Sequence, residues 1–227
     1  MARASTPKSI PKSTPLQAHP KIYAEGKHDY KYLTALAGNG AILPYAKGTL
    51  LVATAVKRRI EAIKRDIGND AIECVIWIVD GGDQHIKDST HFIAFYKKWL
   101  SKKNGDWKKL HVLINTPCLE YWFLLHRIDP PLDTKDVPIC FENADALFES
   151  VEFKKHCPEG KGANLVSAVV RDAAGSKQAI QRAKNLSNHL NKLAEKNLIK
   201  VARAEMYQIF ELIKVESPSY LSHNCVD

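Results

Sequence analysis

Short apolar runs of strand length recur along the first half of the chain. Residues 72–79 (IECVIWIV) and 110–114 are almost continuously apolar, which is typical of strands covered on both faces of a parallel sheet. A shorter apolar run covers residues 22–24 and ends in Glu-Gly. These runs predict three strands.

Stretches with a helical period lie between and after these runs. Residues 27–37 are helix-like, residues 49–66 and 91–101 carry apolar positions at helical spacing, and residues 119–126 form a strongly apolar helix. Strands that alternate with helices predict an α/β fold with parallel crossovers.

The ends of the chain differ from this core. Residues 1–20 hold four prolines, three Lys or Arg residues and no acidic residue, which predicts a flexible basic tail. Beyond a core at 21–128, residues 129–141 are rich in Pro and Asp and predict a loop. We expect residues 142–227 to form a helical C-terminal part packed on the core, with helices at 142–155, 162–173, 176–197 and 200–214.

The net charge of the chain indicates the kind of partner that it binds. Lys and Arg number 33 against 25 Asp and Glu, a net charge of +8, and the pI is about 9.1. Such an excess favours a polyanion, nucleic acid before membrane. The five cysteines form no CxxC pair, which argues against a zinc site and favours a reduced, cytoplasmic location. No apolar run approaches the roughly 18–20 residues of a membrane span, so we expect no membrane partner.

Three polar residues directly follow the predicted strands: Glu25, Asp80 and Asn115. Ligands of open α/β sheets bind beyond the carboxyl ends of the strands. Carboxylates that converge there, such as those of Asp80-Gly-Gly-Asp83, suit Mg²⁺. The alternatives are that Glu25 only favours the following helix N-terminus and that Asp-Gly-Gly-Asp is an ordinary turn.

The segment 115–126 holds the least ordinary carboxylate. Glu120 has almost wholly apolar neighbours, and a buried carboxylate is costly unless it is paired or bound to a metal. Thr116 as N-cap, with Pro117 at the first helical position, explains the helix start without any function. For His126 we favour a helix-end histidine that satisfies backbone carbonyls over a functional role.

This segment also carries a family resemblance. Residues 115–126 (NTPCLEYWFLLH) closely resemble the Asn-Pro-Cys-Phe-Glu-x-Trp-Leu-Leu-Leu-His signature of RloB-like phage-defence proteins, with one Thr inserted and Leu119 in place of Phe. That family also opens with a strand ending in Glu-Gly, like Glu25-Gly26. Residues 179–184 (AIQRAK) and 201–213 resemble its Ala-Ile-x-x-Ala-Lys segment and its closing amphipathic helix.

The resemblance implies a TOPRIM-like fold, a mostly parallel sheet flanked by helices, with a metal-dependent site. By position, Glu25 would be the general acid/base, Asp80 a metal ligand, and Glu120 a third catalytic residue. Glu25, Asp80 and Asp83 would together hold Mg²⁺ or Mn²⁺. Asp-Gly-Gly-Asp departs from the family's Asp-x-Asp spacing, so another residue, such as Asp88, would be needed if Asp83 does not complete the pair.

Basic residues suit a nucleic-acid backbone, because each neutralised phosphate releases condensed counterions. The alternative is a solvated helix face. Trp99 and Trp107 could stack on bases, although core packing explains at least one of them. The candidate nucleic-acid-binding residues are Lys27, Lys161, Arg171, Lys177, Arg182 and Lys184.

Taken together, these features predict a metal-dependent endonuclease that hydrolyses RNA, with tRNA favoured, as a toxic effector in abortive infection. Family members are often encoded beside an ATPase, which would be a partner, and a homo-oligomer is also compatible with the sequence. The alternative is a non-catalytic subunit of a defence complex that uses a degenerate TOPRIM site to bind nucleic acid or a partner. Primase-like nucleotidyl transfer would need a nucleotide pocket that the sequence does not reveal.

Overall fold

A computed structural model describes residues 19–38, 49–50, 55–83, 86, 89–102, 104–134, 137–193 and 202–213. The basic tail predicted for the start of the chain lies outside these residues, apart from its last two positions. Asp88, the alternative acidic residue, and the segment after residue 213 also lie outside them.

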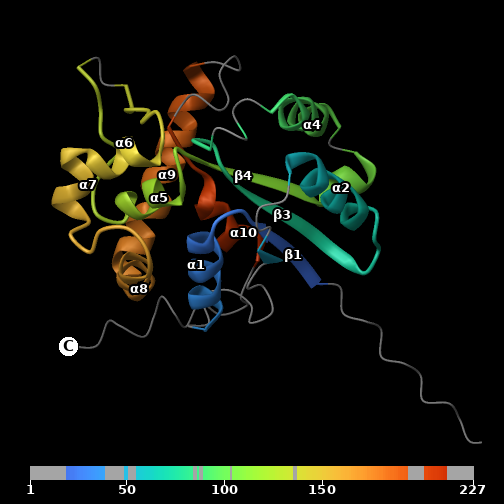
Figure 1. Cartoon of the computed structure of the whole chain (residues 1–227), viewed down its shortest axis with the longest axis horizontal. Helices are drawn as coiled ribbons and strands as arrows, with labels where there is room; N and C mark the ends of the chain where they lie inside the picture. The colour runs from blue at the N-terminus through green and yellow to red at the C-terminus, as the bar shows by residue number, and fades with distance from the viewer. Residues whose placement is uncertain are drawn as a thin grey trace, which may run out of the picture.

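A mostly parallel sheet forms the centre of the fold, as the apolar runs predicted (Figure 1). Its strand order is β2-β1-β3-β4-β5, with β1 to β4 parallel and β5 antiparallel to β4. The strands are β1 (His19–Ala24), β2 (Thr49–Leu50), β3 (Ile72–Asp80), β4 (Leu110–Thr116) and β5 (Arg203–Ala204).

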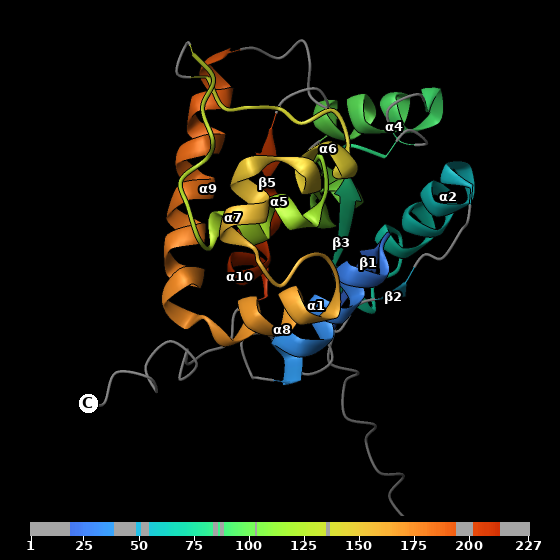
Figure 2. The same cartoon turned by 60° about the vertical axis from the view of Figure 1, so that its left-hand side comes forward.

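Helices cover both faces of this sheet (Figures 1 and 2). One face carries α2 (Val56–Ile67) and α4 (Thr90–Ser101), and the other carries α1 (Lys27–Gly38) and α5 (Leu119–Leu125). Because successive side chains of a strand point to opposite faces, Trp77 of β3 packs with α2 and α4, whereas Ile78 packs with α1 and α5. Burial on both faces explains why β3 has no polar alternation.

After α5, the described residues add helices to the α1 and α5 side, and the first four follow one another in the chain. They are α6 (Ala144–Glu149), α7 (Val151–His156), α8 (Ala163–Arg171) and α9 (Ala173–Leu193). α8 lies against α1, and α9 lies against α5. The helix predicted at 142–155 is in fact two, because Ser150 interrupts it and its hydroxyl accepts a hydrogen bond from the Phe153 N–H at the start of α7.

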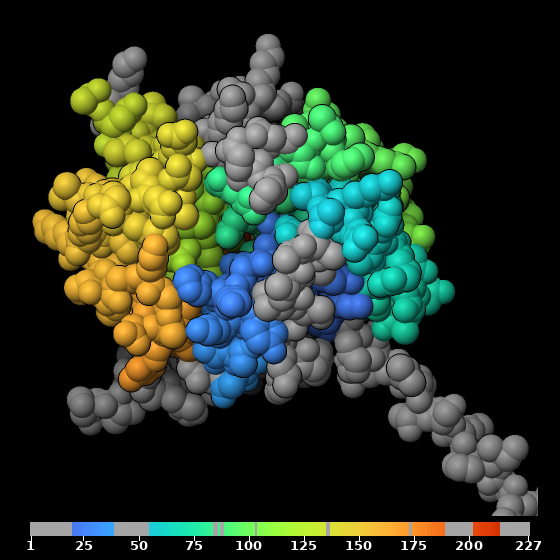
Figure 3. Space-filling model, in the orientation of Figure 1, coloured from blue at the N-terminus to red at the C-terminus, as the bar shows by residue number. Residues whose placement is uncertain are grey.

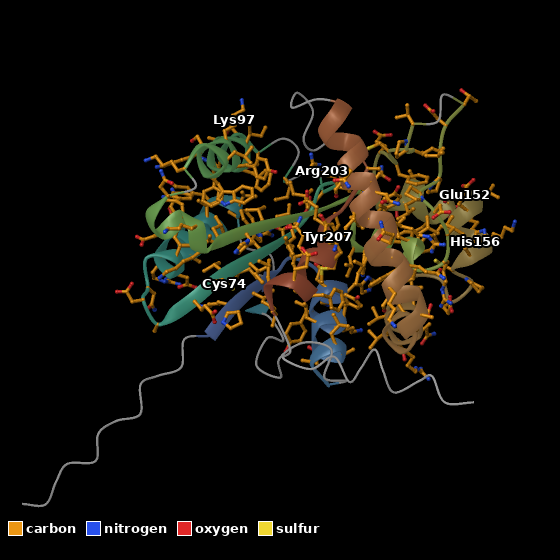
Figure 4. The ribbon with its side chains drawn as sticks, turned by 180° about the vertical axis from the view of Figure 1, so that it is seen from behind. Cys74, Lys97, Glu152, His156, Arg203 and Tyr207 are labelled. Atoms are coloured by element: carbon orange, nitrogen blue, oxygen red, sulfur yellow. The ribbon has the colours of Figure 1, made fainter. Side chains whose placement is uncertain are left out.

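The prediction of a helix over 200–214 was wrong at its beginning. β5 pairs with the edge of β4, a short 3₁₀ turn follows (η2, Glu205–Gln208), and among the described residues 202–213 the α-helical part is α10 (Ile209–Leu212). The Glu205 carboxylate accepts a hydrogen bond from the Ile114 N–H at 2.8 Å and pairs with Arg203 at 2.8 Å. An edge strand leaves backbone N–H groups unpaired. β5 pairs with residues 115 and 116 of β4, and the Glu205 carboxylate accepts from the N–H of the preceding residue, Ile114. Seen from behind, Arg203 and Tyr207 lie between the sheet and α9 (Figure 4).

Two other helix starts differ from the predictions. Residues 49 and 50 are strand β2, so the helix predicted from residue 49 begins only at Val56. Thr116 is not an N-cap, because β4 continues through it and α5 begins at Leu119, with Cys118 as the N-cap residue and no side-chain capping bond. Trp99 and Trp107 are partly buried against the α2–α4 core, which favours packing for both. No helix in the described ranges is long and apolar enough to cross a membrane.

Candidate functional site

The three polar strand ends meet at one edge of the sheet, as predicted. Asp80, the last residue of β3, lies opposite Asn115 of β4 in the parallel register, and Glu25 directly follows the neighbouring strand β1. In the space-filling view, this face of the molecule is hollowed near its middle, between the blue surface of β1 and α1 and the green surface of later segments (Figure 3). The fold therefore gathers the candidate residues from segments far apart in the sequence.

The two glycines between Asp80 and Asp83 have a packing reason. The N–H of Gly81 bonds to the Asn115 carbonyl and the N–H of Gly82 to the Pro117 carbonyl, both at 2.7 Å. A Cβ on Gly81 would lie 2.2 Å from the Thr116 Oγ1, and one on Gly82 would lie 2.5 Å from the Pro117 carbonyl oxygen. The two strand-end loops thus touch backbone to backbone, and this close approach accounts for the Asp-Gly-Gly-Asp spacing.

Glu25 is held by groups from two other elements. Its Oε1 accepts a hydrogen bond from the Trp77 indole at 3.0 Å and lies 2.9 Å from an Arg59 guanidinium nitrogen of α2. The Glu25 side chain is only 5% exposed. Burial raises its pKa to about 7, although Arg59 and the Trp77 hydrogen bond oppose the shift. Its other oxygen, Oε2, is buried without a hydrogen-bond partner in the described part of the chain.

Asp29 and Asp80 extend this acidic cluster. The Gly26 N–H donates to Asp29 Oδ2 at 2.7 Å, and a Cβ on Gly26 would lie 3.0 Å from that oxygen and 3.9 Å from Asp80 Oδ2. Burial raises the Asp29 pKa to about 7, and the charges of Glu120 and Glu25 add to the shift. Burial raises the pKa of Asp80 well above its ordinary value, and the charges of Asp29, Glu120 and Glu25 add to the shift, although the Leu119 N–H donates to Asp80.

Glu120 is buried, as its apolar neighbours predicted, and it has a specific partner. Its Oε1 lies 2.6 Å from Nδ1 of His28, and the side chains of Glu120 and His28 are 6% and 37% exposed. His28 belongs to the first turn of α1, whereas Glu120 belongs to the first turn of α5. The pair therefore joins the start of α1 to the start of α5.

The chemistry of the cluster fits a hard divalent cation. Within the described residues, Glu25 Oε2, Asp29 Oδ1 and Asp80 Oδ1 are buried carboxylate oxygens without a hydrogen-bond partner. Oxygen atoms of this kind are what Mg²⁺ binds, and it keeps several waters. The described side chains contain no group of three His, Cys, Asp or Glu residues already arranged as a metal site. Asp83 is half-buried and close enough to Glu25 for its charge to raise the pKa of that carboxyl.

Asn115 and His126 occupy different surroundings. Asn115 is fully buried at the strand end, and neither atom of its amide has a hydrogen-bond partner in the described segments. The prediction that His126 satisfies helix-end carbonyls was wrong. Its ring is 3% exposed, neither ring nitrogen is hydrogen-bonded to a described residue, and it packs edge-on against Trp122. It belongs to the core because α9 covers the end of α5.

Two of the six candidate nucleic-acid-binding residues are paired with other residues of this chain. Arg182 donates to the carbonyl of Leu125 and to the carboxylate of Asp129, both at 2.8 Å, and so ties α9 to the end of α5. Lys184 pairs with Glu211 at 2.7 Å. Both pairings serve packing between helices of this chain.

The other four basic candidates are exposed. Lys27 lies in the first turn of α1, two residues after Glu25, and Lys161 precedes Gly162, whose backbone lies beside the His28 ring. Lys177 and Arg171 lie further along α9 and α8. The Lys161 ammonium lies over the Phe148 ring, 5.0 Å from its centroid, whereas Lys27 is close to Glu25 in the sequence.

Sequence reasoning missed three residues that contact the cluster: Arg59, Trp77 and His28. Arg59 follows Arg58 in a basic amphipathic helix, and only the fold turns one of these adjacent arginines toward Glu25. The sequence indicates only that Trp77 is a core residue. Its indole N–H can donate to Glu25 because β1 and β3 are neighbouring strands. For His28, the local signal was its position two residues after Glu25-Gly26, near a predicted strand end.

Comparisons with known proteins leave the family of this chain open. No protein-family model, no curated protein sequence and no solved structure matches it.

Proposed function

We propose that the chain is a metal-dependent phosphodiesterase that cleaves RNA at the carboxyl end of its parallel sheet. The observation that carries the proposal is the buried cluster of Glu25, Asp29, Asp80 and Glu120. Burying four carboxylates together is costly, and three of their oxygens have no hydrogen-bond partner among the described residues. Ionisable groups in such an arrangement are concentrated at functional sites.

In this proposal the residues of the cluster have separate roles. Asp80 and Asp83 would hold Mg²⁺ or Mn²⁺ beside the unpartnered oxygen of Glu25. A bound divalent cation would stabilise the charge that develops on the phosphoryl oxygens. Glu25 takes a proton from the attacking water, because Arg59 and Trp77 fix its other oxygen and leave Oε2 available. Asp29 fixes the turn that carries Glu25 by accepting from the Gly26 N–H.

Charge supports a nucleic acid as substrate. The chain has a net charge of +8, and the exposed Lys27 follows Glu25 by two residues. The resemblance of residues 115–126 to the RloB-like signature extends the proposal to a TOPRIM-like toxic effector of anti-phage defence. It favours tRNA as the substrate, a cytoplasmic location, and a neighbouring ATPase as partner.

Cleavage by the purified protein tests this proposal. Wild type is incubated with bulk tRNA in Mg²⁺, in Mn²⁺ and in EDTA, beside Glu25→Gln and Asp80→Asn. We expect cleavage with either cation, none in EDTA, and a loss of at least about 100-fold in both variants. Glu61→Gln, an exposed carboxylate on α2, is the matched control and should cleave like wild type.

Two results would contradict the proposal. Cleavage that continues in EDTA would rule out the dependence on a metal, and full activity of Glu25→Gln would rule out its role with the proton. Tight tRNA binding without cleavage under every condition would instead favour the non-catalytic binding subunit.

A further inference from the structure

The pair of His28 and Glu120 has the geometry of a proton-transfer dyad. The two residues are 92 positions apart in the sequence, and Nδ1 of His28 lies 2.6 Å from Oε1 of Glu120. A hydrogen bond this short is typical of one with an ionised partner. It fixes the plane of the imidazole and assigns Nδ1 as the nitrogen that donates to the carboxylate.

Nε2, the second ring nitrogen of His28, lies beside the backbone of Gly162. Gly162 has φ +102°, a conformation that favours glycine, and a Cβ there would lie 3.6 Å from the Nε2 of His28. The His28 side chain is 37% exposed, although its partner carboxylate is almost fully buried.

The dyad also lies beside the proposed reaction site. The charge of Glu120 acts on both Asp29 and Asp80, so the pair lies within electrostatic range of the cluster. His28 is three residues from Glu25, on the turn whose Gly26 approaches Asp80. A phosphodiester held at Asp80 would therefore have Glu25 and the His28 ring close by.

We propose that His28 is the general acid of the cleavage reaction and that Glu120 is its positioning residue, an inference that rests on the proposed function. As the oxygen of water bonds to phosphorus, the water proton passes to Glu25 and the bond from phosphorus to the leaving oxygen breaks. The leaving oxygen takes its proton from Nε2 of the doubly protonated His28. Solvent then returns a proton to His28 and removes one from Glu25, which restores both groups.

Substrates with different leaving groups test this inference. An RNA leaving group is a poor alkoxide that needs protonation, whereas the p-nitrophenolate of bis(p-nitrophenyl) phosphate leaves without it. His28→Ala and His28→Gln should therefore lose about 100- to 10,000-fold on RNA and less than about threefold on the p-nitrophenyl ester. Glu25→Gln should lose both activities. His91→Ala, an exposed histidine on α4 at the other face of the sheet, should lose neither.

Glu120 acts through His28, so its test needs a second readout. Glu120→Gln should show the same selective loss on RNA, and a two-bond ¹H–¹⁵N spectrum of the neutral ring should show that the proton has left Nδ1 for Nε2. The glutamine variant of His28 can still hydrogen-bond to Glu120, which separates loss of the acid from loss of folding.

The outcomes separate the two proposals. If wild type cleaves neither substrate in Mg²⁺ or Mn²⁺, the proposed function fails and the inference fails with it. If wild type cleaves both, but the two His28 variants lose neither activity or lose both equally, the inference alone is overturned.

Discussion

His126 gives the fold a pH dependence whose size can be worked out from its surroundings. The ring packs at 5.0 Å between centroids, edge-on, against Trp122, and neither of its nitrogens is hydrogen-bonded to a described residue. Burial, helped by the positive charges of Arg127 and Arg182, lowers its pKa from 6.5 to about 3. The folded protein therefore keeps this ring neutral where an unfolded chain would protonate it.

The sign follows from the direction of this shift. Above pH 6.5 the ring is neutral in both states and has no effect on stability. As the pH falls below 6.5, only the unfolded state gains the proton, so the free energy of unfolding drops by up to about 1.4 kcal/mol per pH unit until about pH 3. Between pH 8 and pH 5 the loss is about 2 kcal/mol.

Glu25 and Asp29 act in the opposite direction. Their raised pKa values let the folded state hold protons that the unfolded state releases, so their contribution to stability increases as the pH falls from about 7 toward the ordinary carboxyl range. A comparison with His126→Phe removes this shared contribution, because both proteins keep the same carboxylates.

Urea unfolding of wild type and His126→Phe at pH 8 and pH 5 measures the effect. Any packing cost of the larger ring is the same at both pH values and cancels. We expect the variant to gain about 2 kcal/mol over wild type on going from pH 8 to pH 5. A difference within about 0.5 kcal/mol of zero, the usual scatter of such comparisons, would refute the burial of a neutral His126.

Two further predictions concern the site. Gly82→Ala should lower the free energy of unfolding by about 1–3 kcal/mol, because its Cβ would lie 2.5 Å from a backbone carbonyl oxygen of the next loop. Urea unfolding checks this, with Gly38→Ala as control, since a Cβ at Gly38 meets nothing within 4 Å; equal effects at both glycines would count against the close approach. Arg59→Gln should move the pKa of Glu25 above its value of about 7, because it removes the positive charge that opposes the shift. Carbon-13 NMR titration of the Glu25 carboxyl in EDTA measures this, and an unchanged or lower pKa would contradict the contact.

The strand ends could be predicted from sequence because the geometry of a parallel sheet is general. Once 22–24, 72–79 and 110–114 are read as parallel strands, the residues after them must meet at one edge. The common location of Glu25, Asp80 and Asn115 could therefore be predicted from the strands alone. The burial of Glu120 was also predictable, because its apolar neighbours leave it no route to solvent.

The partners of these residues could not be predicted in the same way. The pairing of Arg59 with Glu25, and of His28 with Glu120, depends on how the crossover helices rest on the sheet. The error at His126 arose because a helix end is usually solvated, and nothing local to residues 119–126 shows that α9 covers it. The strand in the segment before α10 was missed because two residues carry no periodicity.

Sequencing of small RNA from cells tests the central claim most directly. Wild type and Glu25→Ala are expressed from an inducible promoter with Mg²⁺ in the medium, and total small RNA is sequenced after induction. The account predicts growth arrest and tRNA fragments with new ends for wild type, and neither for the variant. Identical fragments from both proteins would contradict the role of Glu25, and intact tRNA in cells that arrest with wild type would contradict RNA cleavage as the activity.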